Sequence, residues 1–331
     1  MLRVAIIGTG GWADVLVDSV QEKSSAVRIA ACHSRSTARR EDFARRHDCR
    51  PLESFADALR DPGIDALILV TPHSTHRALI EAAAAAGKHV FCEKPLALTA
   101  DDARAAAEAC RRAGVVLAVG HNRRFTAAAR RIKSMLENGE FGVVSHLEAQ
   151  FSFPGALLYK RDNWRADPSE NPGGAIASCG IHIVDTAQWL LGPILDVTAI
   201  CRRRFDRLDL PDTTIALVSF ESGPTGYLGT LFAAPYLCWL NIYGSRQAAM
   251  AELDADRLRL HSADATHATL IDAPLDPCDS VRAELEAFAS ACTGNAPYPI
   301  ATLDAIRNVE VMEAIIRSAA EEGRRVEIGG G

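Results

Sequence analysis

The 331-residue sequence has no apolar run near the ~20 residues that a membrane-spanning helix needs. It also has no CxxC pair, and its nine cysteines are scattered, which favours reduced thiols over a disulfide framework. Neither sign of charge dominates: a net charge of −6 with mixed signs gives no reason to expect nucleic acid or an anionic membrane as a partner. The chain enters an apolar stretch directly after its first residue, so we expect no signal peptide and a cytoplasmic location.

Metal-ligand spacing is also missing. His73 and His76 are separated by two residues, but no cysteine or carboxylate stands beside them at the spacing of a metal site, so we expect no metal. With 48% hydrophobic and 24% charged residues, the composition is that of a globular protein. Its length exceeds one ordinary hydrophobic core, so two domains are expected.

The first strong pattern is a strand, a glycine turn and a helix at the start of the chain. Residues 2–7 are continuously apolar, as in a strand that is buried on both faces. The turn that follows reads Gly8-Thr9-Gly10-Gly11-Trp12-Ala13. In this G-x-G-x-x-A pattern Gly8 permits a tight turn, Gly10 lets the backbone approach a pyrophosphate, and Ala13 allows the helix to pack closely on the strand. The sequence therefore predicts a dinucleotide-binding turn.

The end of a second predicted strand, residues 28–32, bears on which dinucleotide is bound. In an NAD enzyme, an acidic residue about 20 positions past the glycine turn binds the ribose 2′-hydroxyl. Here that place is taken by Ser34, which is followed by Arg35. These two side chains can hold a 2′-phosphate, with the arginine contributing charge and a flat stacking face. An ordinary exposed loop arginine is the alternative, but the pattern favours NADP over NAD.

Strands and helices continue to alternate, roughly every 20 to 30 residues, up to residue 121. One predicted strand, 65–70, ends at Thr71-Pro72, and the next ends at Glu93-Lys94-Pro95. In the strand order 3-2-1-4-5-6, both ends border the crevice where doubly wound sheets bind their ligands. A surface Lys-Pro turn is the alternative for Lys94. We predict a doubly wound parallel Rossmann domain over residues 1–121.

The pattern changes from residue 122 onward. A predicted helix, 127–138, and a predicted strand, 143–153, precede an irregular segment rich in proline and glycine, 154–174. Strands with short connections are then expected at 194–204, 213–220, 225–233, 237–243 and 257–261, as in an antiparallel sheet. Helices are expected in the latter part of 176–191, at 279–293 and at 302–322. We predict a second, α+β domain over residues 122–331.

Three motifs in this order resemble the Gfo/Idh/MocA oxidoreductase family. They are the glycine turn, the Glu93-Lys94-Pro95 strand end, and Gly173-Gly174 followed by Gly180-x-His182-x-x-Asp185. The match extends over nearly the whole chain through Thr71-Pro72, Asn122-Arg-Arg-Phe125 and Glu284-Leu-Glu-Ala-Phe288. The resemblance implies a Rossmann domain followed by a domain with an open, mostly antiparallel sheet. It also implies hydride transfer between NADP or NAD and a secondary alcohol or ketone, commonly on a sugar or cyclitol.

The resemblance also implies roles for single residues. Lys94 would donate and accept the proton at the reacting oxygen, and His182 would hydrogen-bond that oxygen or a neighbouring hydroxyl. A packed core histidine is the alternative for His182, and Asp185 has a structural alternative as well. The implied cofactor-binding residues are Gly8, Thr9, Gly10, Gly11, Trp12, Ala13, Ser34, Arg35, Thr71, Pro72, His73, His76, Glu93, Lys94, Asn122, Trp164 and Arg165. The implied substrate-binding residues are Lys94, Arg123, Ser178, His182 and Tyr236.

One position departs from the family pattern. The pattern D-x-G-x-H has an aspartate two residues before the glycine, and Ser178 stands there in this chain. A serine can hydrogen-bond a hydroxyl but carries no charge. A regulatory protein that binds a dinucleotide without turnover, and a glycosidase that uses NAD transiently, therefore stay open as alternatives to a dehydrogenase.

The predicted strand 214–220 also bears on assembly. Its alternation places Ile215 and Leu217 on one face of the sheet, and Ala216, Val218 and Phe220 on the other. A sheet that helices cover on one side should be polar on its open face. We therefore expect a second subunit to cover the open face, in a homodimer or a homotetramer.

The Ser34-Arg35 pair generates a prediction about cofactor preference. The protein should bind NADP(H) more tightly than NAD(H), and Arg35→Ala should reduce NADP affinity by about 1–3 kcal/mol, as for the loss of a charged hydrogen bond. NAD affinity should hardly change, because NAD has no 2′-phosphate. Titration of both cofactors into the unmodified protein and the variant tests this. An equal loss for both cofactors, or tighter binding of NAD by the unmodified protein, would contradict it.

Overall fold

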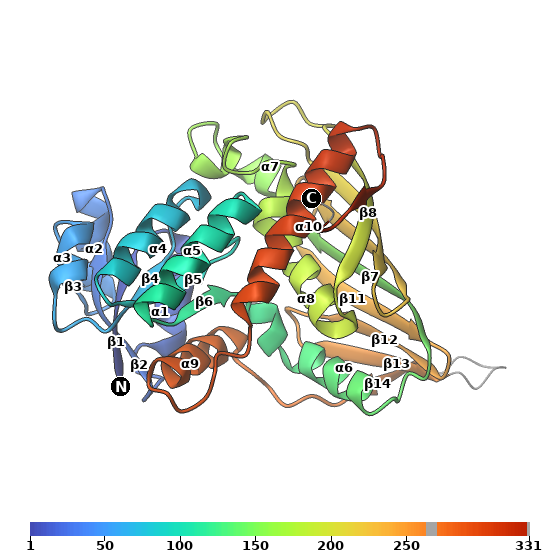
Figure 1. The fold of residues 1–331 in the computed structure, drawn as a ribbon, viewed down its shortest axis with the longest axis horizontal. Helices are drawn as coiled ribbons and strands as arrows, with labels where there is room; N and C mark the ends of the chain where they lie inside the picture. Colours follow the sequence, from blue (N-terminus) through green and yellow to red (C-terminus); the bar gives the residue numbers. More distant parts are fainter. Residues whose placement is uncertain (263–269, 330–331) are drawn as a thin grey trace. The chain divides into compact units, whose positions relative to one another are not determined.

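A six-stranded sheet and a nine-stranded sheet organise the computed structural model, which describes residues 1–262 and 270–329 (Figure 1). The chain divides into two units. The first comprises Met1–Asn122 and Asp279–Ile306, and the second comprises Arg123–Cys278 and Arg307–Gly331. Helix α9 (Ser280–Cys292) therefore belongs to the first unit, although it follows most of the second unit in the sequence. The sequence-based boundary after residue 121 stays a prediction about the functional domains.

The sheet of the first unit is entirely parallel, with the order β3-β2-β1-β4-β5-β6. Its strands are β1 (Leu2–Ile7), β2 (Val27–His33), β3 (Arg50–Pro51), β4 (Ala66–Leu69), β5 (His89–Glu93) and β6 (Leu117–Gly120). The helices between them are α1 (Gly11–Val20), α2 (Thr37–Arg46), α3 (Phe55–Arg60), η1 (His73–Thr75), α4 (His76–Ala85) and α5 (Ala100–Ala113). This confirms the predicted Rossmann fold and its strand order.

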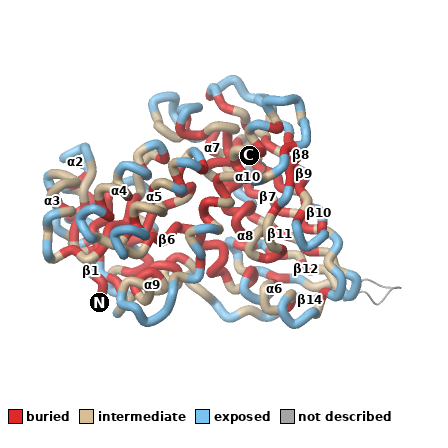
Figure 2. Tube along the Cα trace, viewed as in Figure 1, coloured by how far each residue is buried: buried red, intermediate tan, exposed pale blue. Residues whose placement is uncertain are grey.

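Different helices cover the two faces of this sheet. Val4, Ile6, Ile68 and Phe91 lie in one hydrophobic core with residues of α1, α2 and α9. Within that core, the rings of Phe91 and Phe288 have centroids 5.7 Å apart. Helices α4 and α5 pack against each other, and α4 also contacts β5. The strands are buried between these two layers (Figure 2), which explains why their sequences are continuously apolar rather than alternating.

The nine-stranded sheet has the order β14-β13-β12-β11-β7-β10-β9-β8-β15. All its neighbouring strands are antiparallel except β7 and β10, which are parallel, so the predicted mostly antiparallel sheet is confirmed. The strands are β7 (Val144–Ser152), β8 (Ile194–Arg202), β9 (Thr213–Phe220), β10 (Thr225–Leu231), β11 (Leu237–Gly244), β12 (Gln247–Glu252), β13 (Arg257–Ser262), β14 (Leu270–Ala273) and β15 (Val326–Glu327). The helical segments outside the first sheet are η2 (Asn122–Phe125), α6 (Ala127–Glu137), α7 (Gly155–Leu158), η3 (Trp164–Ala166), η4 (Ile176–Gly180), α8 (Ile181–Leu191) and α10 (Thr302–Ala320).

Helices cover one face of this sheet. Helix α8 contacts β7, α6 contacts β12, and the amide of Ala199 in β8 donates to Ser318 Oγ of α10 at 2.9 Å. On the opposite face large apolar side chains stay exposed, among them Leu217 of β9 at 58% and Ile200 of β8 at 49%. The open face is thus less polar than a solvent-facing sheet surface is expected to be.

A buried ion pair joins η2 to α8 within the second unit. The side chains of Arg124 and Asp185 are only 4% and 0% exposed, and Arg124 Nη2 lies 2.6 Å from Asp185 Oδ1. Arg124 Nε donates to Oδ2 at 2.8 Å, and Asn308 Nδ2 donates to Oδ1 at 2.7 Å. A buried carboxylate needs such partners because an unpaired one would be costly to desolvate. Asp185 therefore has a structural role: it fixes α8 one turn after His182.

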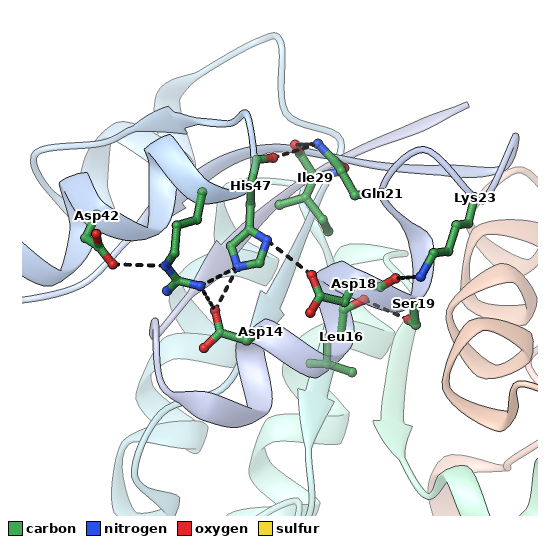
Figure 3. Close-up of polar contacts among 10 residues, drawn as sticks. Asp14, Leu16, Asp18, Ser19, Gln21, Lys23, Ile29, Asp42 and His47 are labelled. Carbon is green, nitrogen blue, oxygen red and sulfur yellow. Dashed lines mark hydrogen bonds and ion pairs between the residues drawn. The ribbon is translucent and has the colours of Figure 1, made fainter.

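A polar network ties α1 to α2 in the first unit (Figure 3). His47 Nε2 lies 2.7 Å from Asp14 Oδ1, and its Nδ1 lies 3.4 Å from Asp18 Oδ1. Arg46 bonds Asp14 at 2.6 Å and Asp42 at 2.9 Å. Burial raises the pKa of Asp14, but hydrogen bonds from His47 and Arg46 outweigh it, so the pKa lies below its ordinary value.

None of the helices in residues 1–262 and 270–329 combines the length and the apolar character of a membrane span.

The lowered pKa of Asp14 generates a stability prediction. Because the folded pKa lies below the unfolded value near 4, the contribution of the carboxylate is present above about pH 4 and is lost as the pH falls further. Asp14→Asn should therefore lower the free energy of unfolding by about 1 kcal/mol at pH 7, and this difference should shrink below about pH 4. Urea denaturation at several pH values measures it. Asp18→Asn, which alters a more exposed carboxylate of the same helix, is the control and should have a smaller effect; a deficit for Asp14→Asn that persists at low pH would contradict the prediction.

Candidate functional site

The glycine turn after β1 has the geometry of a dinucleotide-binding turn. Gly8 has a φ of +99°, and a Cβ on it would overlap the carbonyl oxygen of Val70. A Cβ on Gly10 or Gly11 would meet no atom within 4 Å, so open space lies over the turn. Gly10 is the N-cap of α1 and makes no side-chain cap. The first amides of α1 therefore remain available, and they fit the pyrophosphate of a dinucleotide.

Lys94 follows directly after β5, and its neighbours fix the backbone there. The side chain of Glu93 is nearly buried and accepts a hydrogen bond of 2.6 Å from Trp12 Nε1. A Cβ on Gly120 would lie only 3.0 Å from Glu93 Oε1, so glycine at the end of β6 leaves room for this carboxylate. The Lys94–Pro95 peptide is cis, and Lys94 itself is half-buried.

His76 joins the ends of β4 and β5. Its ring is fully buried, with Nδ1 2.9 Å from the carbonyl oxygen of Pro95 and Nε2 3.1 Å from that of Thr71. Thr75 Oγ1 donates to Thr71 Oγ1 at 2.8 Å, and His73 packs beside His76 with ring centroids 5.8 Å apart. These contacts engage His76 with the backbone after both strands, so it positions Thr71 and Pro95.

The end of β2 carries the pair that the sequence singles out. Ser34 Oγ donates to the carbonyl of Ser36 at 3.2 Å, and Ser36 caps α2 by accepting from the amide of Arg39 at 3.4 Å. Arg35 is exposed and has no hydrogen bond or ion pair with any of the described residues. Its guanidinium is therefore available to a ligand.

In the second unit, a π-helical turn leads into the helix that carries His182. The turn, η4, precedes α8 directly, and such turns occur often at functional sites. A Cβ on Gly180 would overlap Ile176 and lie 2.7 Å from Thr230 of β10. Glycine at position 180 thus lets the start of α8 lie close against the sheet.

His182 is held by the guanidinium of Arg123. The ring is only 3% exposed, and Arg123 Nη1 lies 3.3 Å from His182 Nε2. Arginine can only donate, so Nε2 accepts and the ring hydrogen resides on Nδ1. Phe151 packs against both residues, with its centroid 4.8 Å from Arg123 Cζ and 5.7 Å from the His182 ring. The histidine is therefore set to donate a hydrogen bond through Nδ1.

Asp254 completes this polar group, and no sequence pattern pointed to it. Tyr236 donates to Asp254 Oδ2 at 2.6 Å and accepts from Arg123 Nη2 at 3.1 Å. Burial raises the pKa of Tyr236, and the nearby Asp254 adds to this shift against the opposing effect of Arg123, so the phenol keeps its proton. Asp254 lies 131 positions from Arg123 in a turn of ordinary composition, which is why the sequence carried no signal for it.

The remaining predicted residues divide between the two units. Ser178 is half-buried and points its hydroxyl toward Cys179 Sγ at 3.8 Å. In η3 the guanidinium of Arg165 stacks over Trp164, with Cζ 4.2 Å from the ring centroid. Asn122 Nδ2 donates to Ser280 Oγ at 3.4 Å in the first unit. Across residues 1–262 and 270–329, no group of three or more His, Cys, Asp or Glu side chains has the arrangement of a metal site.

Comparison with known proteins agrees with this geometry. Residues 2–121 match the family model GFO_IDH_MocA, described as an oxidoreductase family with an NAD-binding Rossmann fold, and residues 129–250 match the GFO/IDH/MocA C-terminal domain. D-xylose 1-dehydrogenase (NADP(+)) 2 of Haloferax volcanii is 30% identical over 337 residues, which cover 99% of this chain and 100% of that protein. 1,5-Anhydro-D-fructose reductase of Ensifer adhaerens is 28% identical over 287 residues, 84% of each protein. The solved structure of aldose-aldose oxidoreductase from Caulobacter crescentus, complexed with glycerol, is 25% identical with a TM-score of 0.88 over 99% of both chains.

These matches span both units, and one relative aligns from end to end at 30% identity. The glycine turn and the strand order of the first unit are those of an NAD-binding Rossmann fold. The chain is therefore an NAD(P)-dependent oxidoreductase of the Gfo/Idh/MocA family.

Proposed function

We propose that this oxidoreductase interconverts a secondary alcohol and a ketone on a sugar, a cyclitol or a related small polyhydroxylated molecule. The observation that carries the proposal is Lys94 at the carboxyl end of β5, in the same parallel sheet as the Gly8 turn. The names of two relatives, which specify D-xylose and 1,5-anhydro-D-fructose, support the substrate class.

The first unit would hold the dinucleotide through its own backbone. The amides that begin α1 bind the pyrophosphate, and Ser34 with Arg35 binds a 2′-phosphate, so NADP is the proposed preference and NAD the lesser ligand. Thr71, Pro72 and His73 border the crevice beside β4. When bound, the nicotinamide accepts the hydride in oxidation and supplies it in reduction.

Lys94 would act as the acid–base group. In alcohol oxidation, Nζ takes the proton of the hydroxyl group while the hydride leaves the carbon that bears this hydroxyl. In ketone reduction, Nζ returns a proton to the oxygen. Glu93 is anchored to Trp12, and His76 is anchored to the Pro95 carbonyl. Both residues flanking Lys94 are thus held in place, and such positioning is what proton transfer in a transition state requires.

The second unit would supply substrate-binding groups. His182 donates through Nδ1 to a substrate oxygen, because Arg123 occupies its Nε2. Tyr236 and Ser178 add neutral hydrogen-bonding groups, and the Trp164–Arg165 stack covers bound ligands. A hydroxyl-rich molecule matches this set, since each group can bond a hydroxyl without requiring a charge on it.

A panel of sugars, cyclitols and small ketones, assayed in both directions with NAD(H) and NADP(H), tests the proposal. Net reduction of added NAD(P)⁺ by a polyol, or net oxidation of NAD(P)H by a ketose, is expected. Cofactor binding without turnover of any compound would support the regulatory alternative. Bond cleavage without net change of the cofactor would support the glycosidase.

Lys94→Met tests the assignment of the acid–base group. Methionine keeps much of the aliphatic volume, so the fold and cofactor affinity should survive, while kcat and kcat/KM fall together by ~10²–10⁴-fold. Lys88→Met is the matched control, since Lys88 precedes the same strand and donates to the carbonyls of Asp61 and Ile64. That control should alter stability but leave kcat in place. A Lys94→Met protein with the full rate and the full pH profile would show that Lys94 is scaffold.

We also propose a homodimer or homotetramer and a cytoplasmic location. All nine cysteines are free, which agrees with a reducing compartment. On the open face of the sheet, Ile200 pairs with Ile215, and Leu217 pairs with Thr198 and Tyr227, so the exposed apolar side chains are contiguous. A contiguous apolar patch of this kind marks a protein interface.

Light scattering at micromolar concentration should show the assembly, and Leu217→Asp should shift it toward monomer by placing a charge in the interface. Leu303→Asp changes a comparably exposed leucine on α10 and should leave the assembly unchanged. A monomer of the unmodified protein at micromolar concentration would remove the proposal.

A further inference from the structure

Arg123 lies in a polar group that we call the Arg123 cluster: Arg123, His182, Tyr236 and Asp254, all in the second unit. The Arg123 side chain is only 6% exposed, so its charge is largely removed from water. Asp254 Oδ1 lies 3.0 Å from Arg123 Nη2, and Oδ2 lies 3.2 Å from the same nitrogen. Asp254 is thus a counter-charge placed directly against a buried arginine.

The turn that carries Asp254 is fixed on both sides. It connects β12 to β13, and the amide of Leu253 donates to the carbonyl of Cys238 at 2.9 Å. Two residues past Asp254, the carboxylate of Asp256 accepts from the amide of Ala128 at 3.0 Å. With Tyr236 bonded to Oδ2 as well, the carboxylate is held in one place against Arg123.

The Asp254 side chain is nevertheless 27% exposed, in contrast to the arginine behind it. A ligand that approaches His182 and Tyr236 from the solvent-exposed side of Asp254 would therefore meet the carboxylate before the guanidinium charge. A neutral hydroxyl can donate to this carboxylate, whereas a carboxylate or phosphate on the ligand would be repelled by it. The guanidinium is a good anion-binding group in itself, because its planar fork matches a carboxylate.

We propose that Asp254 is a specificity-determining residue. Its carboxylate pairs with the Arg123 guanidinium, so that the substrate site binds uncharged polyols and disfavours sugar acids and sugar phosphates. This inference rests on the proposed function, since it takes the surroundings of His182 as the substrate site. It narrows the substrate class: the preferred ligand carries hydroxyl groups and no anionic substituent at the position facing Asp254. Asp254 then supplies the carboxylate that the family pattern places at position 178, where this chain has a serine.

Calorimetric titration of D-glucose and D-glucuronate into the NADP-loaded protein tests the inference, because the two probes differ mainly in the charge of one substituent. The unmodified protein should bind glucose at least ~10-fold more tightly than glucuronate. Asp254→Asn keeps the shape and the hydrogen-bond acceptor but removes the charge, so the affinity for glucuronate should rise ~10-fold or more while the affinity for glucose does not rise. The added substitution Arg123→Gln should abolish that gain, since the gain acts through the guanidinium.

Asp256→Asn is the matched control, because it neutralises a carboxylate of the same turn and keeps the acceptor for the Ala128 amide. Its ratio of glucose to glucuronate affinity should equal that of the unmodified protein. If the unmodified protein binds glucose and glucuronate with equal affinity, the inference is overturned, and this result requires no variant. An Asp254→Asn protein that binds cofactor but gains no affinity for glucuronate also overturns it. Failure of the proposed function would be seen in a different measurement: no compound of the panel would give net turnover of the cofactor.

Discussion

The parallel alignment of β1, β4 and β5 is the constraint on which the chemistry of the first unit depends. Ile7 lies opposite Leu69, and Leu69 lies opposite Cys92, so the three strands end at nearly the same level of the sheet. Neighbouring strands are about 4.8 Å apart, which places the backbone of Lys94 on the order of 10 Å from the glycine turn. The proposed dinucleotide, anchored at the end of β1, would therefore reach the end of β5. The close contact of Gly8 with the Val70 carbonyl depends on the same alignment.

Arg123 and Arg124 are adjacent in the sequence, but their acidic partners differ in how far they are buried. Arg124 faces a carboxylate that is completely buried and has a further partner in Asn308, so the pair forms part of the interior. Arg123 faces Asp254, which solvent reaches. The Arg124–Asp185 pair fixes α8 and therefore the position of His182 on it. The Arg123–Asp254 pair sets the charge beside His182, and Arg123 sets the tautomer of its ring. One short segment, η2, thus contributes both to the packing of the second unit and to the proposed substrate site.

Much of the fold could be predicted because its signals are local. The buried strands of the first sheet are continuously apolar, the glycine turn follows directly after β1, and Gly114 ends α5 with a φ of +67°. Features that depend on distant contacts could not be predicted. Strand β12 contains several alanines, which have little preference for strands, and it forms because β11 and β13 pair with it on both sides. Asp254 and the bond between Asn308 and Asp185 arise in the same way, from residues far apart in the chain.

The return of α9 to the first unit has a consequence for how the protein is made. Val281, Leu285 and Phe288 are buried in the core shared with β1 and β5, yet they follow the first sheet by more than 150 residues of the chain. During synthesis on the ribosome the Rossmann sheet emerges first with helices α1 and α2 of this core, and the part of the core that α9 fills stays open until most of the second unit has been translated. Apolar surface that is exposed during this interval can associate with other nascent chains. The order of translation therefore leaves the core of the first unit incomplete for longer than in a Rossmann unit whose sequence is contiguous.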